Sequence, residues 1–437
     1  MLRTNSILAG LAAVITAAAT FAACSASNGG GASGGFAGGG IGGSSGTAPG
    51  TGGVVFTATG TGAGMQHCDQ SDPNKDGDGD GWTPAQGDCN DCDPNVNPGA
   101  VDVLVTPDGG MPVQVDANCN GMFDPPAPCD DGLALDDVSP VSGAKAIGVC
   151  RLASADGTRG KEGYSWGLLD AGYTLANGTP FTPGLDVGIM PNFGPNVNPQ
   201  EGASLLVLSS GHARIKGQPG ACNSDSCGPD VLHHAPPLFP ANVPGCPGKP
   251  GTPIYDDVAL DLKLRAPTNA TGFKFNFKFH SFEFPEYVCT RFNDQFIALV
   301  APPPMGSQNG NISFDSMNNP VSVNIAFFDV CNPATGGMWA QNCGPPAQCP
   351  PMPNPYCPSG PAQIVGTGFE GGWGNVGGAT SWLETESPVT SGEEFEIRFT
   401  IWNTGDNALY STVLVDGFSW IASGNVAVGT GKVPNPK

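Results

Sequence analysis

The chain has 437 residues, of which 66 are glycine, 43 are proline and only 13% are charged, and its formal net charge is −22 at pH 7. This length leaves room for two or three domains. The lack of lysine and arginine clusters excludes a nucleic-acid-binding surface, so the negative charge favours inorganic cations or serves solubility. Long helices are also excluded, because no periodic run of helix-forming residues follows residue 25.

Residues 1–23 have the composition of an export signal, with Arg3 ahead of a run of small apolar residues. Phe21-Ala22-Ala23-Cys24 resembles a bacterial lipobox, which implies that the Cys24 thiol is acylated and becomes the new N-terminus. Several acyl chains on one residue hold a protein stably on a membrane. We therefore expect an exported lipoprotein at the outer membrane or cell surface. The alternative is an ordinary signal peptide.

Residues 24–64 are dominated by Gly, Ser, Ala and Thr. This composition buries too little apolar surface to offset the entropy of the chain. We therefore expect a flexible tether that holds the next segment roughly 35 Å from the membrane.

Aspartates recur between residues 65 and 130 at a spacing typical of calcium loops. Asp76-x-Asp78-x-Asp80-Gly81 places an oxygen-bearing side chain at every second position, and Asp116-x-Asn118-x-Asn120-Gly121-x-x-Asp124 repeats that pattern. The twelfth position of the first loop is Gly87, so later carboxylates would have to complete its shell. The alternative is a disordered acidic loop. The predicted ligands are Asp72, Asn74, Asp76, Asp78, Asp80, Asp88, Asp91, Asp93, Asp116, Asn118, Asn120 and Asp124.

Calcium is the expected metal, because the predicted ligands offer only oxygen. Copper is the second candidate and would use Met65, His67 or Met111. Zinc is a further alternative, for which the ligands would be Cys68, Cys89, Cys92 and Cys119. The segment has few large apolar residues, Trp82 and Phe123 among them, so we expect its folding to require metal.

The cysteine content fits an oxidising compartment, because removal of Cys24 from the 15 cysteines leaves an even number. We expect seven disulfides, mostly within domains. The N-terminal set is Cys68, Cys89, Cys92, Cys119, Cys129 and Cys150, and the C-terminal set is Cys222, Cys227, Cys246, Cys289, Cys331, Cys343, Cys349 and Cys357.

Residues 131–425 consist of short β-like runs between turns, and Phe273–His280 alternates strictly between Phe and polar residues. The pattern predicts a mainly β protein with a β-sandwich or jelly-roll-like domain. Stretches at 215–253 and 331–361 are interpreted as disulfide-pinned insertions, and 426–437 as a tail. The expected strands are Ser204–Ser209, Val258–Leu264, Phe273–His280, Phe296–Val300, Val321–Phe328, Glu394–Trp402 and Ser411–Trp420.

The acidic segment resembles the metal-binding motif repeat of secreted bacterial proteins and thrombospondin type 3 calcium repeats. The resemblance rests on the two loops above and on Gly87-Asp88-Cys89-Asn90-Asp91 and Asn97-Pro98-Gly99-Ala100. It implies metal binding without naming the metal.

The later part of the chain resembles the choice-of-anchor L domain of bacterial surface proteins. The resemblance rests on four stretches: Leu205–Ala213, Phe282–Val288 with Phe292-Asn293-Asp294-Gln295-Phe296, Asn403–Asn407 and Ser411–Phe418. It implies a surface module with no known reaction. The sequence departs from the family by reading Glu283-Phe284-Pro285-Glu286 at the paired acids and by carrying two cysteine-rich insertions.

Polar residues at expected strand ends are candidates for catalysis or for binding a second cation. Glu283, Glu286, Asn293, Asp294, Asp406 and Asp416 would either hold a cation or accept hydrogen bonds from turn backbone. The acids Glu283, Glu286 and Asp294 could serve a glycosidase. Ser209 or Ser210 with His212 could serve nucleophilic catalysis, although no G-x-S-x-G elbow is present. His233-His234 is interpreted as a loop without an acidic partner.

We therefore expect a non-catalytic binding or adhesion module whose partner is a surface glycan or another cell-surface protein. A cation-stabilised structural component and a secreted hydrolase are the alternatives.

Overall fold

The computed structural model describes residues 71–105, 110–161, 163–241, 251–284, 287, 290–315, 318–323, 360–370 and 377–437. All of these described residues belong to one compact unit. Several predicted features lie outside the described residues: Cys24, the tether, Met65, His67, Glu286, nearly all of the 331–361 insertion, and Cys68, Cys246, Cys289, Cys331, Cys343, Cys349 and Cys357.

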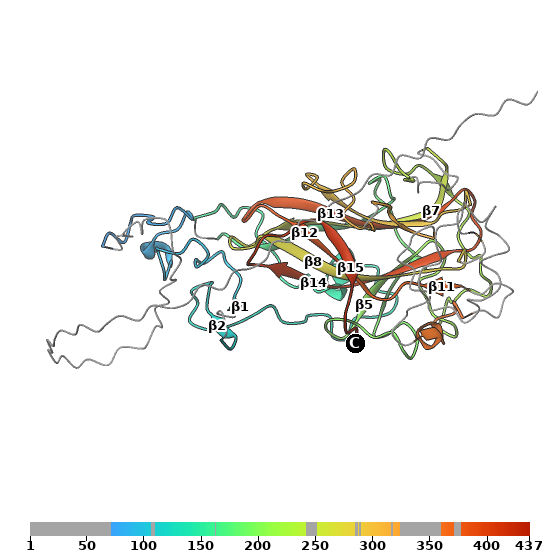
Figure 1. Ribbon diagram of the computed structural model, residues 1–437, viewed down its shortest axis with the longest axis horizontal. Helices are drawn as coiled ribbons and strands as arrows, with labels where there is room; N and C mark the ends of the chain where they lie inside the picture. Colours follow the sequence, from blue (N-terminus) through green and yellow to red (C-terminus); the bar gives the residue numbers. More distant parts are fainter. Residues whose placement is uncertain are drawn as a thin grey trace, which may run out of the picture. The chain divides into compact units, whose positions relative to one another are not determined.

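The mainly β prediction is confirmed, and the described residues form three antiparallel sheets. A six-stranded sheet has the order β10-β9-β13-β7-β3, with β6 also paired to β7. A seven-stranded sheet has the order β15-β12-β8-β14-β5-β4, with β11 also paired to β8, and Figure 1 shows β8, β12, β14 and β15 side by side in it.

The strands of the six-stranded sheet are β3 (Gly167–Thr174), β6 (Leu232–His233), β7 (Ile254–Arg265), β9 (Gln295–Ala301), β10 (Val321–Ser322) and β13 (Glu394–Thr404). Those of the seven-stranded sheet are β4 (Val187–Met190), β5 (Leu205–Ser209), β8 (Gly272–Ser281), β11 (Gly378–Ala379), β12 (Leu383–Pro388), β14 (Ser411–Ile421) and β15 (Gly429–Lys432). The acidic segment contributes a ribbon of β1 (Val103–Val105) and β2 (Val113–Val115). The remaining elements are α1 (Pro140–Ala146) and the 3₁₀ turns η1 (Pro84–Gln86) and η2 (Gly360–Ile364).

Phenylalanine rings from both sheets fill the space between them. The alternating Phe residues of β8 are fully buried, as the strand period predicts for a core face. Phe275 meets Phe399 of β13 edge to face at a centroid distance of 4.9 Å, and Phe277 meets Phe296 of β9 at 5.0 Å. Such pairs add about 0.5–1.5 kcal/mol each beyond the burial of their area.

The second face of β8 is polar in sequence, but the structure buries it as well. Lys278 and His280 have no exposed surface. The Lys278 Nζ donates to Gln363 Oε1 of η2 at 2.9 Å, and the His280 ring lies 5.0 Å from Phe193 and 5.3 Å from Phe369. Burial lowers the pKa of His280 well below its usual value, so the imidazole is neutral.

Six of the expected strands agree with β5, β7, β8, β9, β13 and β14 within a few residues. The expected strand Val321–Phe328 is observed only as β10, and residues 324–328 lie outside the described part of the chain. Within the expected tail, residues 429–432 form β15 and pair with β12. This pairing was missed because the glycine-rich Gly-Thr-Gly-Lys sequence has low intrinsic strand propensity.

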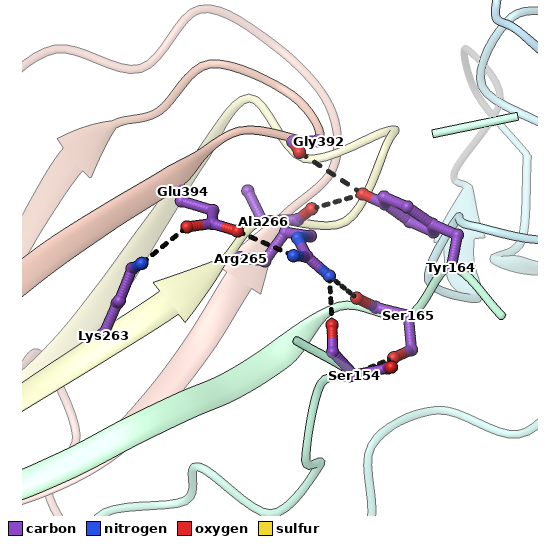
Figure 2. Close-up of polar contacts among 8 residues, drawn as sticks. All are labelled: Ser154, Tyr164, Ser165, Lys263, Arg265, Ala266, Gly392 and Glu394. Atoms are coloured by element: carbon purple, nitrogen blue, oxygen red, sulfur yellow. Dashed lines mark hydrogen bonds and ion pairs between the residues drawn. The ribbon is translucent and has the colours of Figure 1, made fainter. Parts of the chain in front are cut away.

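Arg265, at the end of β7, joins three segments of the chain (Figure 2). Its guanidinium donates to the carbonyls of Ser154 and Ser165, at 2.7 and 3.0 Å, and to Glu394 Oε1 at 2.7 Å. The residue is only 4% exposed. It therefore fixes the connection that precedes β3 against β13.

Arg265→Met should lower the free energy of unfolding by about 2–4 kcal/mol, because a buried guanidinium and its three hydrogen bonds, to two carbonyls and the Glu394 carboxylate, are lost. Lys263→Met is the matched control, since Lys263 binds the other oxygen of Glu394 at 2.8 Å but is exposed. The control should change stability little. Urea unfolding of both variants checks this, and equal losses would contradict the role assigned to Arg265.

Candidate metal centre

The loop of residues 76–81 is folded around its own carboxylates. Asp76 accepts from Gly79 N at 2.6 Å and from Gly81 N at 3.0 Å. Asp78 and Asp80 each accept, through Oδ1, from the amide two residues later, at 3.1 and 2.7 Å. Gly79 and Gly81 have φ values of 86° and 100°, which glycine adopts without strain. As a result, carboxylate oxygens of the three aspartates lie within 4.8 Å of one another.

Asp88 and Asp91 bring two further carboxylates to this loop. Asp91 Oδ1 accepts from Gly77 N at 2.9 Å, and a Cβ on Gly77 would lie only 2.6 Å from Asp91 O. Asp88 Oδ1 accepts from Asn90 N at 2.9 Å, and its carboxylate is repelled by that of Asp78. We call Asp76, Asp78, Asp80, Asp88 and Asp91 the first acidic cluster.

Three carboxylates of the first acidic cluster have one oxygen that receives no hydrogen bond. The Oδ2 atoms of Asp78, Asp80 and Asp88 are buried and have no donor among the described residues. Burial, followed by repulsion from neighbouring carboxylates, raises the pKa of each to about 6. A buried carboxylate oxygen without a donor costs free energy, and a bound cation would remove that cost. The arrangement therefore fits a hard, oxygen-binding metal ion.

The first acidic cluster is held against the sandwich by two contacts. The Arg159 Nε donates to the Asp80 carbonyl at 2.6 Å. Trp82, only 2% exposed, packs edge to face on Tyr164 with ring centroids 5.2 Å apart. Tyr164 in turn donates to Ala266 O at 3.2 Å, as Figure 2 shows. The predicted ligand Asp80 is thus positioned by residues more than 75 positions later in the chain.

The stretch Asn97-Pro98-Gly99-Ala100 and the residue after it form the second docking point. Val101 exchanges two hydrogen bonds with the Asn269 side chain, at 2.9 and 2.8 Å. The Trp166 Nε1 donates to Ala100 O at 3.0 Å. A Cβ on Gly99 would come within 2.8 Å of Trp82 and Tyr164, so glycine is required there. The acidic segment therefore buries Trp82, Ala100 and Val101 where it contacts the sandwich.

The second loop repeats the backbone pattern of the first. Asp116 accepts from Gly121 N at 2.8 Å, and Asn118 Oδ1 accepts from Asn120 N at 3.1 Å. The side-chain amides of Asn118 and Asn120 donate to Asp124 at 2.8 and 3.0 Å. The four predicted ligands are therefore brought together, but they satisfy one another and lie at a more exposed position than the first cluster.

Asp102 organises the second loop and was missed by the sequence reasoning. Its Oδ1 accepts from the amides of Ala117 and Asn118, at 2.9 and 3.1 Å, and its Oδ2 accepts from Asp124 N at 2.7 Å. No spacing signal identifies it, because it lies outside the loop motif and is adjacent only in space.

Two other predicted ligands, Asp72 and Asp93, serve local turns. Asp72 Oδ1 accepts from Asn74 N at 3.0 Å, and Asp93 Oδ1 accepts from Asn95 N at 3.1 Å. These are turns in which a side chain caps the amide two residues later. The carboxylates that converge in the first loop are those of Asp76, Asp78 and Asp80.

Disulfides link Cys89 to Cys119, Cys129 to Cys150 and Cys222 to Cys227, and Cys92 is also disulfide-bonded. The Cys89–Cys119 bond joins the two acidic loops. The zinc alternative is therefore wrong for these cysteines, because oxidised sulfurs do not supply thiolate ligands. The copper candidate Met111 is 85% exposed.

The candidate nucleophiles, Ser209 and Ser210, and the candidate base, His212, form hydrogen bonds with other groups. The hydroxyls of Ser209 and Thr412 share a hydrogen bond of 2.8 Å, and Ser210 Oγ donates to Asn403 Oδ1 at 2.5 Å. The His212 Nδ1 contacts Gly220 O at 2.7 Å. The described contacts therefore do not assemble a serine–histidine pair.

The acids Glu283 and Asp294 are enclosed in the protein, with exposures of 2% and 0%. Asp294 accepts from Thr404 N at 2.9 Å and from Ser411 Oγ at 2.6 Å. Burial raises the pKa of both acids well above their usual values. An enclosed pair of this kind is not accessible to a polysaccharide.

Asp406 and Asp416 accept hydrogen bonds from backbone amides, which is the alternative to cation binding expected for them from the sequence. Asp406 accepts from Ala408 N at 3.1 Å, and Asp416 accepts from Gly417 N at 2.6 Å and Glu201 N at 3.2 Å. Burial raises the pKa of Asp416 to about 7.

The interpretation of His233 as a loop residue without an acidic partner is wrong. His233 lies in β6, and its Nδ1 is 2.5 Å from Asp257 Oδ1. Asp257 also accepts from Ala176 N at 2.5 Å, so the carboxylate bridges β6 to the chain after β3. The partner is missed in the sequence because 24 residues separate it from His233.

The fold and this site define a class of protein: a β-sandwich with an acidic, disulfide-linked segment docked on it and no assembled catalytic group among the residues described. Residues 206–420 match the family model of the choice-of-anchor L domain. The match indicates a bacterial cell-surface protein in which this domain has a non-catalytic role. No curated protein and no solved structure matches the chain. Among the described residues, no helix combines the length and apolarity that crossing a membrane requires.

Proposed function

We propose that this chain is a lipid-anchored bacterial surface protein, a non-catalytic binding module whose first acidic cluster holds a calcium ion. The observation that carries the calcium site is the set of buried Oδ2 atoms of Asp78, Asp80 and Asp88, which receive no hydrogen bond. Backbone amides already satisfy the Oδ1 atoms of these residues. A cation is the natural partner for the oxygens that remain.

Calcium suits the first acidic cluster better than other ions. The cluster offers only carboxylate and backbone oxygens, which hard cations prefer. Calcium accepts six to eight oxygens in flexible geometry, whereas magnesium requires a tight octahedron. Five carboxylates on an irregular loop suit the flexible coordination of calcium better than the octahedral coordination of magnesium. Asp116, Asn118, Asn120 and Asp124 form a second, weaker site in this proposal.

The ion would act on the contact between the acidic segment and the sandwich. Asp80 is bonded through its carbonyl to Arg159, and the next residues lead into Trp82 on Tyr164. Neutralising the cluster removes the repulsion that opposes this docking. Calcium therefore strengthens the docking of the acidic segment on the sandwich.

Calcium titration of the full secreted chain tests the metal site. The soluble Cys24→Ala protein should bind calcium with an affinity in the extracellular range of about 10⁻⁴–10⁻³ M and magnesium much more weakly. Isothermal calorimetry and the melting temperature are the measurements. Absence of heat and of stabilisation at millimolar calcium would overturn the metal assignment. Binding of copper(II) that does not need the aspartates would do the same.

Lipidation rests on the sequence Phe21-Ala22-Ala23-Cys24 and the tether behind it. Cys24→Ala should release the protein from the membrane fraction, and intact mass should show acyl chains on wild-type protein only. Ser27→Ala, a substitution three residues after the anchor that leaves Cys24 in place, is the control and should stay in the membrane fraction. An unmodified wild-type N-terminus would contradict the proposal.

A further inference from the structure

A cavity of about 500 Å³ lies between the second acidic loop and the sandwich. Asn118 and Asp124 line it from the loop, and Trp166, Glu201 and Trp420 line it from the sandwich. Its volume is in the range of small-molecule binding sites. The cavity is separate from the first acidic cluster, none of whose residues lines it.

Its aromatic wall is held in place by surrounding rings. Trp420 packs edge to face on Phe395 and Phe418, with centroids 6.1 and 5.2 Å away, and on Trp166 at 6.3 Å. Trp166 is anchored by the hydrogen bond of its Nε1 to Ala100 O. Trp420 is partly exposed, so one apolar surface of a ligand can lie against a ring that loses little freedom on binding.

The remaining wall offers hydrogen-bonding groups of both kinds. Glu201 is an acceptor and the guanidinium of Arg151 is a donor, whereas Asn118 and Asp124 are already hydrogen-bonded to each other. Ligand hydroxyl groups, which both donate and accept, can bind Glu201 and Arg151 at the same time.

The charges decide between classes of ligand. Asp102, Asp124 and Glu201 outnumber the single cation Arg151, so the cavity repels phosphates and other anions. A cationic ligand would need open aromatic faces. The Arg151 guanidinium already lies 4.4 Å from the Trp166 ring centroid, where it would repel a second cation. With anionic and cationic ligands disfavoured, the cavity best fits a neutral ligand rich in hydroxyl groups.

We propose that this cavity binds one or two pyranose units of a neutral glycan, with the C–H face of a sugar on Trp420 and its hydroxyls on Glu201 and Arg151. The proposal rests on the proposed function in one respect, that the chain binds a surface partner without transforming it. It does not depend on calcium in the first acidic cluster.

The test uses the full oxidised chain carrying Cys24→Ala, in calcium. The probes are cellotriose, maltotriose, mannotriose and chitotriose, with tetramethylammonium and inorganic phosphate as charged comparisons. Binding is followed by saturation-transfer NMR and calorimetry. Trp420→Phe keeps an aromatic ring in the packed site, and Glu201→Gln keeps the shape of the side chain. Glu396→Gln, an exposed acid on β13 outside the cavity, is the matched control.

We expect at least one trisaccharide to bind, and each cavity variant to weaken it by about tenfold, a change of about 1.4 kcal/mol. Glu396→Gln should bind as wild type does. The proposal is overturned if no trisaccharide binds, if both cavity variants bind as tightly as wild type, or if only a charged probe binds. Calcium titration of the same samples distinguishes the two proposals. If sugar binding is lost while calcium binding is intact, only the proposal for the cavity is affected.

Discussion

Asp80→Asn should abolish the calcium-dependent stabilisation of the protein while leaving the calcium-free protein at least as stable as wild type. The substitution keeps an oxygen to accept from Trp82 N but removes one charge from a buried cluster. Affinity for calcium should fall by about two orders of magnitude, because the affinity of such sites varies over decades with the number of charged ligands. Wild-type protein gains about 2.7 kcal/mol when calcium is at 100 times its dissociation constant.

Thermal unfolding with and without calcium measures both effects. Asp93→Asn is the matched control, since Asp93 lies in the same segment and only caps a turn. It should retain the full calcium response. A calcium-free Asp80→Asn protein that is clearly less stable than wild type would show that the carboxylate has a structural role without metal.

The stability of the wild-type protein and of Asp80→Asn should depend differently on pH. Burial raises the pKa of Asp78, Asp80 and Asp88 to about 6 in the folded, metal-free protein, above the ordinary 3.8. Between pH 4 and about 6 the folded state therefore binds more protons than the unfolded state, so these groups favour folding at low pH and lose that contribution as pH rises. Protons compete with calcium over this range. Calcium affinity should thus be weaker at pH 5 than at pH 7.5, and the metal-free stability of Asp80→Asn should vary less with pH.

Trp82→Ala should detach the acidic segment from the sandwich. The side chain is buried against Tyr164, and truncating a large buried aromatic costs about 3–5 kcal/mol. Because the core between the sheets does not include Trp82, the loss should appear as local opening rather than as unfolding of the sandwich. Calcium affinity should fall as well, since Asp80 is two residues away.

Amide hydrogen exchange of residues 76–102 is the measurement, with exchange of β8 as the internal reference. Leu104→Ala is the control, because this residue in β1 is apolar but 61% exposed. Faster exchange should be confined to the acidic segment of Trp82→Ala. Exchange at the wild-type rate would contradict the docking role of Trp82.

Local patterns in the sequence were sufficient for features that depend on neighbouring residues. Strict alternation in Phe273–His280 predicted a strand with a phenylalanine face, and the rings of β8 do form the core between the sheets. The Asp-x-Asp-x-Asp-Gly spacing predicted converging carboxylates because side-chain oxygens capture amides only a few residues away. Within a short loop, the order of residues determines which groups can meet.

Tertiary structure decided which of these groups are buried. The Asp80 oxygen lacks solvent because Arg159 and Tyr164 hold its loop on the sandwich, and nothing near Asp80 in sequence indicates this. The polar face of β8 is enclosed because η2 and distant aromatic rings cover Lys278 and His280. Burial is a property of contacts between distant segments, and it converts an acidic loop that water would solvate into a site that favours a cation.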